Sequence, residues 1–150
     1  MNIVLLAPEI PQNTGSIGRL CVNLNYKLHL IKPLGFSLEE KMLRRAGLDY
    51  WEFLDLRIHE SWEDFIANEQ PNQFAFASTK TTQCIYDLNF KACEYIIFGS
   101  ESSGLPPDFY EKHKDGLFQI PMPGEHARSL NLANSVAIVA YEAYRQINHS

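Results

Sequence analysis

The most constraining feature of the sequence is a regular alternation of short apolar runs with helical patterns along nearly the whole chain. Each run is rich in leucine, β-branched or aromatic side chains, which is typical of buried strands. Such an alternation favours an α/β fold with a mainly parallel sheet and helices on both faces. The predicted strands are Ile3–Ala7, Leu28–Ile31, Phe53–Ile58, Phe74–Ala77, Tyr95–Phe98 and Leu117–Ile120.

Helix start signals lie between several of these runs. Ser37–Glu40 and Ser61–Asp64 have the spacing of capping boxes, and Gly47 would end the first of these helices. Pro106–Pro107 suits the first turn of another helix. A last helix from about Leu130 to Ile147 is apolar nearly all round, which favours contact with a partner subunit.

Length and charge limit the function classes. The 150 residues contain no repeat or linker, so we expect a single domain over residues 1–150. Thirteen Lys and Arg against 18 Asp and Glu give a net charge of −5, which excludes a generic basic coat for nucleic acid but not a local basic patch.

Cysteine usage and apolar runs bear on the cellular location. Three cysteines without a CxxC pair indicate reduced thiols rather than a disulfide framework or a zinc site, so no metal is expected. The apolar start has no basic region before it and stops at Pro8, unlike a signal peptide. No run approaches the roughly 20 apolar residues that span a bilayer, and we expect a cytoplasmic protein.

Ligands of parallel sheets bind beyond the carboxyl ends of the strands, which selects the loops after Ala7, Ala77, Phe98 and Ile120. In the first of these loops, Asn13 or Thr14 can cap the following helix. Arg19 would then lie one turn into that helix, near its positive end. An arginine gains nothing from the helix dipole there, so a role beyond local stability is indicated. The alternative is an ordinary turn with a surface arginine.

The loop after Phe98 has two glycines, Gly99 and Gly104, that permit a ligand to approach the backbone closely. It matches neither a dinucleotide fingerprint nor a P-loop, and an ordinary strand-to-helix loop is an equal alternative. Glu101 could accept a hydrogen bond from a ribose hydroxyl or an amine. We expect a bulky residue at Gly99 to block the ligand and to leave the fold largely intact.

The loop after Ile120 leads into the last helix. Ser129 and Asn131 lie at the amino end of that helix, where unpaired backbone amides suit a carboxylate or phosphate. Ser129 could instead serve only as the helix N-cap.

The segments that combine these features are Pro8–Gly15 with Arg19, Arg44–Tyr50, Phe98–Pro106, Ile120–Met122 and Arg128–Leu132. In this order they resemble the motifs of the SPOUT class of RNA methyltransferases. The resemblance is closest to the small single-domain subfamily that methylates the ribose 2′-oxygen of the wobble nucleotide of tRNA, cytidine or uridine 34. It covers nearly the whole chain. Ser103 departs from the pattern, because relatives often have a basic residue before the second glycine.

The resemblance implies a trefoil knot in the C-terminal half, S-adenosylmethionine as cofactor, tRNA as substrate and a homodimer. It implies Arg19 as the catalytic residue, reaching the methyl donor of the other subunit. The cofactor-binding residues that it implies are Ala77, Gly99, Glu101, Ile120, Met122, Ser129 and Leu130. Candidates for binding the RNA are Asn13, Arg44, Arg45, Arg128, Asn131 and Tyr141.

A guanidinium group remains charged over the usual pH range, so it is a donor rather than a base. We therefore expect Arg19 to orient the ribose and its phosphate, while the proton leaves through phosphate, Ser129 or water. Alternatives are a SPOUT enzyme that acts on another RNA nucleotide and a non-catalytic dimer that binds S-adenosylmethionine and RNA. A Rossmann-type enzyme is disfavoured, because Gly15 and Gly18 have the wrong spacing for its phosphate loop.

Overall fold

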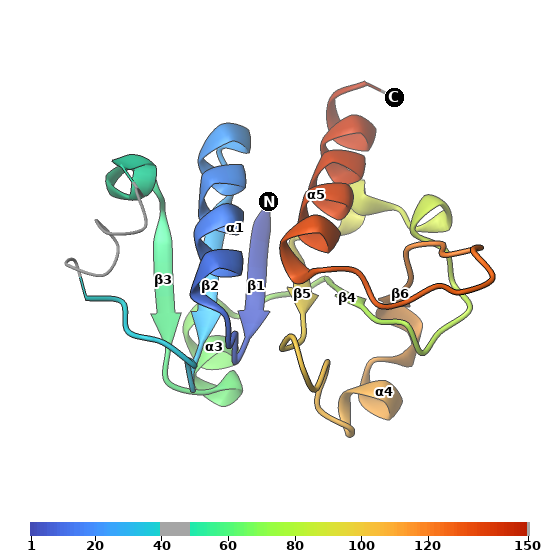
Figure 1. Ribbon diagram of the computed structural model, residues 1–150, viewed down its shortest axis with the longest axis horizontal. Coiled ribbons are helices and arrows are strands. Elements are labelled where there is room, and N and C mark those ends of the chain that lie inside the picture. Colours follow the sequence, from blue (N-terminus) through green and yellow to red (C-terminus); the bar gives the residue numbers. More distant parts are fainter. Residues whose placement is uncertain (40–48, 150) are drawn as a thin grey trace.

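The computed structural model describes residues 1–39 and 49–149. Its described strands form one six-stranded sheet in the order β3-β2-β1-β5-β4-β6, and every neighbouring pair is parallel (Figure 1). The strands are β1 (Asn2–Leu6), β2 (Lys27–Ile31), β3 (Leu56–His59), β4 (Phe74–Ala77), β5 (Tyr95–Phe98) and β6 (Leu117–Phe118). The helices are α1 (Pro11–Leu24), α3 (Trp62–Glu69), α4 (Phe109–Lys112) and α5 (Leu132–Asn148). Short 3-10 turns are η1 (Asp49–Phe53), η2 (Ile85–Asp87), η3 (Phe90–Ala92) and η4 (Lys114–Gly116).

Helices cover both faces of the sheet. Helices α1 and α5 pack side by side on one face, where Ile17 and Val139 join a core with β1 and β5. Phe65 of α3 and Phe109 of α4 pack into a second core on the other face. The predicted α/β class with a mainly parallel sheet is confirmed, whereas the trefoil knot stays a prediction.

Strand positions follow the sequence patterns closely, with one exception. The predicted strands at Phe74–Ala77 and Tyr95–Phe98 have the observed bounds, and Ser61 caps α3 by accepting from the Asp64 amide at 3.1 Å. The expectation of a strand from Phe53 was wrong, because Asp49–Phe53 forms η1 against α1. The helix expected between Ser37 and Gly47 lies mostly outside the described residues.

Three predicted helix starts were also wrong. Helix α1 begins at Pro11, where a fixed φ and a missing N–H suit the first helical position. Asn13 is therefore a buried residue inside the helix, and Arg19 lies about two turns from its start. Helix α5 begins at Leu132 after Asn131, and α4 begins at Phe109, beyond the two prolines.

A pair of buried histidines lies under α3. His29 Nδ1 and His59 Nε2 share a hydrogen bond of 3.0 Å, and His29 Nε2 lies 2.9 Å from Asn2 Oδ1. Burial lowers the pKa of His29 to about 4 and also lowers the pKa of His59, although Glu69, 3.6 Å from His29, opposes both shifts. Protonation of both rings would place two N–H donors against each other, and burial disfavours the charged form of either ring.

We expect acid to destabilise the protein between pH 6.5 and about 4. The unfolded chain takes up protons on His29 and His59 over this range, whereas burial keeps them from doing so in the folded chain, so stability falls as pH falls. The loss from His29 alone is at most about 3 kcal/mol. Urea unfolding at pH 7.5, 6.5, 5.5 and 4.5 measures it. His29→Gln should flatten the dependence, and equal slopes in the two proteins would refute this account.

Candidate functional site

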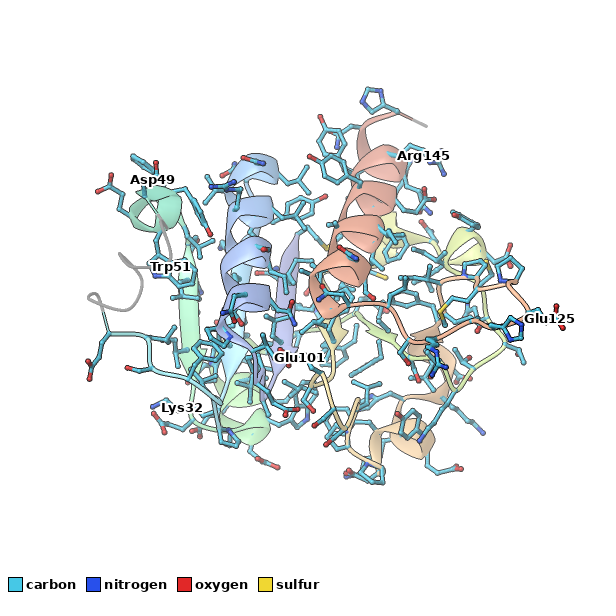
Figure 2. All side chains as sticks on the ribbon, in the orientation of Figure 1. Lys32, Asp49, Trp51, Glu101, Glu125 and Arg145 are labelled. Carbon is cyan, nitrogen blue, oxygen red and sulfur yellow. The ribbon has the colours of Figure 1, made fainter. Side chains whose placement is uncertain are left out.

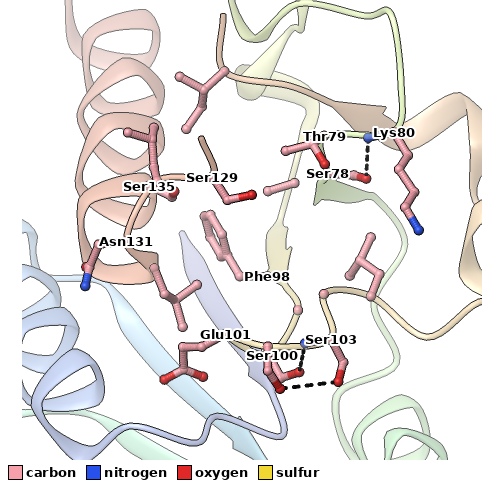
Figure 3. Close-up of a pocket in the computed structure, with 18 of the residues that line it drawn as sticks. Ser78, Thr79, Lys80, Phe98, Ser100, Glu101, Ser103, Ser129, Asn131 and Ser135 are labelled. Atoms are coloured by element: carbon pink, nitrogen blue, oxygen red, sulfur yellow. Dashed lines mark hydrogen bonds between the residues drawn. The ribbon is translucent and has the colours of Figure 1, made fainter. Parts of the chain in front are cut away.

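The loops at the carboxyl ends of β1, β4, β5 and β6 surround one pocket together with the start of α5 (Figure 3). Its volume is about 550 Å³. All the residues that the sequence resemblance implied for the cofactor line it, namely Ala77, Gly99, Glu101, Ile120, Met122, Ser129 and Leu130. Asn13 and Asn131 line it as well. The pocket therefore lies where ligands of parallel sheets bind.

The lining of the pocket combines apolar side chains with small hydroxyl groups. Ile120 and Leu130 contribute apolar walls, and Leu130 is 39% exposed. The labelled hydroxyl residues of Figure 3 come from the loops after β4 and β5 and from the start of α5; they are Ser78, Thr79, Ser100, Ser103, Ser129 and Ser135. This combination suits a ligand with a flat apolar part and several polar groups.

The backbone packing around position 99 requires a glycine there. A Cβ atom at this position would lie 2.1 Å from the Gly104 carbonyl carbon and 2.4 Å from the Leu105 nitrogen. Gly99 is followed by a tight loop in which Ser100 and Gly104 exchange two backbone hydrogen bonds, and Gly104 has a positive φ of 69°. The expectation that a bulky residue at Gly99 leaves the fold largely intact is therefore wrong.

The side chain of Glu101 extends from this loop to the backbone at the start of α1, beyond the ends of the strands (Figure 2). Its carboxylate accepts from the amides of Glu9 at 2.8 Å and Ile10 at 2.7 Å, and from Asn13 Nδ2 at 3.3 Å. The carboxylate oxygens of Glu101 thus accept three hydrogen bonds from within the chain. The sequence had instead suggested a ribose hydroxyl or an amine of a ligand as the donor.

Asn131 is the N-cap of α5, a role that the sequence had offered to Ser129. Its Oδ1 accepts from the amides of Ala133 at 2.8 Å and Asn134 at 3.3 Å. Its Nδ2 donates to Asn13 Oδ1 at 3.0 Å. The two asparagines proposed to hold a nucleotide are therefore bonded to each other, and they join α1 to α5.

Arg19 is exposed on α1 and does not line the pocket. Its guanidinium carbon lies 5.0 Å from the centre of the Tyr50 ring, and the Tyr50 hydroxyl donates to the Gly15 carbonyl oxygen. Burial raises the pKa of Tyr50, partly offset by Arg19, so Tyr50 remains a neutral donor. The ring of Tyr50 thereby supports the guanidinium outside the pocket.

The other predicted RNA-binding residues also lie outside the pocket. Arg128 is exposed in the loop before α5, whose Glu125 projects far from the sheet (Figure 2). Tyr141 is half-exposed on α5. Arg44 and Arg45 lie outside the described residues.

Sequence reasoning missed several residues that line the pocket. Lys80 and Tyr110 face each other at its edge, with Lys80 Nζ 5.0 Å from the centre of the Tyr110 ring. Ser78 holds this loop by accepting from the Lys80 amide at 3.0 Å. The available signal was the position of Ser78–Lys80 directly after the predicted strand Phe74–Ala77, at the same edge of the sheet.

Two possible features are absent from the part of the chain that the structure describes. None of its helices is long and apolar enough to cross a membrane. Nor do residues 1–39 and 49–149 bring together three or more His, Cys, Asp or Glu side chains that could hold a metal ion.

Comparisons with known proteins agree with this geometry. The tRNA (cytidine(34)-2′-O)-methyltransferase of Burkholderia ambifaria is 47% identical over 150 residues, covering 97% of this chain and 94% of that protein. A solved structure described as "Structural insights into the 2-OH methylation of C/U34 on tRNA" is 44% identical, with a TM-score of 0.88 and coverage of 99% of this chain and 97% of that chain.

A more distant structure shares the fold. The SpoU methyltransferase AviRb from Streptomyces viridochromogenes, in complex with AdoMet, gives a TM-score of 0.82 at 23% identity, covering 100% of this chain and 61% of that chain. Residues 1–141 match the sequence model of the SpoU rRNA Methylase family. Together with the relatives that match nearly the full length, this shows that the chain belongs to the SpoU methylase family.

Proposed function

We propose that this protein transfers a methyl group from S-adenosylmethionine to the ribose 2′-oxygen of cytidine or uridine 34 in tRNA. The observation that carries the proposal is a pocket at the carboxyl edge of the sheet, lined by all seven residues that the family resemblance implies for the cofactor. The names of the relatives at 44–47% identity over nearly the full chain support the substrate.

The pocket fits S-adenosylmethionine in size and chemistry. A volume of about 550 Å³ suits a ligand of this size. Ile120 and Leu130 can flank the adenine, while Ala77 and Gly99 border the pocket at the ends of β4 and β5. When bound, the cofactor supplies a methyl group on a positively charged sulfur for an in-line displacement.

The residues of this chain position the ribose. Such a displacement depends on alignment more than on covalent help from the enzyme. Arg19 presents a planar set of donors that can hold a ribose oxygen and a phosphate together. The hydroxyl proton leaves to phosphate, water or Ser129, which lines the pocket.

A second subunit brings Arg19 to a pocket. Asn13 lines the pocket of its own chain, whereas Arg19 lies six positions further, about 9 Å along the helix and on its exposed side. Helix α5, beside α1, exposes Ile138 (39%) and Tyr141 (50%) on its outer face. We propose that a second copy covers this face, so that each Arg19 serves the pocket of its partner.

We expect a dimer in solution. Sedimentation at micromolar concentration should give about twice the chain mass of 17.2 kDa. Ile138→Glu, which places a charge on the exposed face of α5, should shift the distribution toward the monomer. Asn68→Glu adds the same charge at an exposed position of α3, on the other face of the sheet, and serves as the control. A monomer with full activity would contradict the shared site.

The RNA surface must be local, because the chain carries a net charge of −5. Arg19, Arg128 and the pair Arg44–Arg45 supply the cations that we assign to the phosphates of tRNA, and a dimer doubles their number. We place the protein in the cytoplasm, where its free cysteines Cys21, Cys84 and Cys93 remain reduced.

The decisive experiment incubates the protein with total tRNA and S-adenosylmethionine carrying a labelled methyl group. Digestion and mapping should place the label on the ribose of nucleotide 34. A label on another nucleotide would assign a different RNA target, and binding of the cofactor without any transfer would identify a binding protein. Leu130→Glu, with a charge at the adenine wall, is the negative control.

A further inference from the structure

A carboxylate from the loop after β5 caps the start of α1. Ile10 is the N-cap residue, and no side chain of its own region accepts from the helix. Instead, the two oxygens of Glu101 accept from the backbone amides of Glu9 and Ile10, 92 and 91 residues away in sequence. In a capping box a glutamate three positions into the helix bonds back to the N-cap amide. Glu101 makes that bond from a distant loop, and its negative charge lies at the positive end of the helix.

The same carboxylate begins a chain of hydrogen bonds across the site. Asn13 donates to Glu101 Oε2 at 3.3 Å and accepts from Asn131 at 3.0 Å, and Asn131 caps α5. In Figure 3 the polar ends of Glu101 and Asn131 both point toward the side where α1 lies. The amino ends of α1 and α5 are therefore fixed to each other and to the loop after β5.

We propose that Glu101 is a positioning residue, which sets the place of α1, and through α1 the place of Arg19, relative to the two pockets of a dimer. This inference rests on the proposed function. Glu101 borders the pocket, but its oxygens serve the helix. Because Arg19 acts in the partner's site, a substitution of Glu101 in one subunit lowers turnover in the pocket of the other subunit.

A neighbouring contact provides a matched control. Glu9 Oε1 accepts from the amide and the hydroxyl of Ser102 at 3.1 and 2.6 Å, and these bonds lower the pKa of Glu9. This contact joins the same two loops, but it does not involve the Glu101 carboxylate, which accepts from the amides at the start of α1. Glu9→Ala thus loosens the loops and leaves the cap in place.

The first test separates turnover from cofactor affinity. Glu101→Gln replaces one acceptor oxygen with an N–H donor that faces an amide donor. We expect kcat for tRNA to fall about 10-fold or more while the Kd of S-adenosylmethionine changes less than about 2-fold. Hydrogen exchange at the amides of Glu9 and Ile10 should become faster. Glu9→Ala should keep kcat, the Kd and the exchange at Ile10 near those of the wild type.

The second test uses mixed dimers. If Glu101 acts through α1, Glu101→Gln and Arg19→Ala damage the same part of the site, and mixing the two variants restores no activity. Mixing Glu101→Gln with the pocket variant Leu130→Glu should restore activity, because one intact pocket then meets one correctly placed Arg19. A cofactor-binding Glu101 gives the opposite result in both mixtures.

Three results would overturn the inference. They are a rise in the Kd of S-adenosylmethionine that accounts for the lost activity, recovery in the mixture with Arg19→Ala, and unchanged kcat in Glu101→Gln. Failure of the proposed function looks different, because the wild type would then not methylate tRNA or would be a monomer. Amide exchange and cofactor affinity would still show in that case whether Glu101 caps α1 or binds the cofactor.

Discussion

Replacing Arg19 with alanine is expected to lower kcat for tRNA methylation by about 10²- to 10³-fold, the usual loss when one donor to a transition state is removed. The side chain is exposed and its described contact is with the Tyr50 ring, so folding and cofactor affinity should stay near those of the wild type. Single-turnover assays with calorimetry of S-adenosylmethionine measure these quantities. Lys112→Ala, which removes an exposed lysine of α4 paired with Asp108, across the sheet from α5, controls for the loss of charge.

The variant Arg19→Lys distinguishes orientation of the ribose by Arg19 from electrostatic attraction of the RNA. One ammonium cannot hold ribose and phosphate together as a planar guanidinium does, so Arg19→Lys should recover little activity. If Arg19 only attracts RNA, lysine should restore most activity and the defect of Arg19→Ala should shrink at low salt. Assays of both variants at two ionic strengths decide, and full activity in Arg19→Ala would remove its catalytic role.

Mixed dimers test whether Arg19 acts in the partner's pocket. Arg19→Ala keeps an intact pocket, and Leu130→Glu keeps an intact Arg19. Random mixing should form one working site in each mixed dimer, which gives about a quarter of the wild-type rate. No recovery would indicate that Arg19 serves the pocket of its own chain.

Replacing Gly99 with alanine is expected both to destabilise the protein and to abolish cofactor binding. The new Cβ would lie 2.1 Å from the Gly104 carbonyl carbon, a backbone atom that cannot move without opening the Ser100–Gly104 loop. Overpacking of this severity should cost about 3 kcal/mol or more. Urea unfolding and calorimetry measure the two effects.

Gly124→Ala is the control for this change, because a Cβ at Gly124 meets no described atom within 4 Å. It should change stability by less than about 0.5 kcal/mol. Wild-type stability in Gly99→Ala would show that the loop adapts more easily than its geometry indicates. Loss of affinity at Gly99 alone cannot locate the ligand, so Leu130→Glu serves for that purpose.

Much of the fold could be predicted because its signals are local. Apolar runs such as Phe74–Ala77 and Tyr95–Phe98 mark buried strands, and parallel strands bring their following loops to one edge. The position of the pocket therefore follows from sequence order alone. The identity of its residues came from the family resemblance, since patterns of Gly and Ser fit many loops equally well.

The roles of individual side chains could not be predicted, because they depend on contacts between distant residues. From the sequence, Glu101 is expected to have a free carboxylate, but in the fold the amides of Glu9 and Ile10 donate to it. The absence of a side chain at Gly99 suggests room for a ligand, but in the fold the backbone of Gly104 fills the place of a Cβ atom. Asn13 reads as a helix cap, but Pro11 starts the helix earlier and places Asn13 where it bonds Asn131.

The bond between Asn13 and Asn131 joins positions 118 residues apart and closes one wall of the pocket. A nascent chain consequently has no complete binding site until α5 has been made and has packed beside α1. S-adenosylmethionine bound at the proposed site would therefore stabilise the finished fold relative to forms in which α5 has not yet packed. In a cell, a supply of methyl donor would then act as a selective aid to the last step of folding.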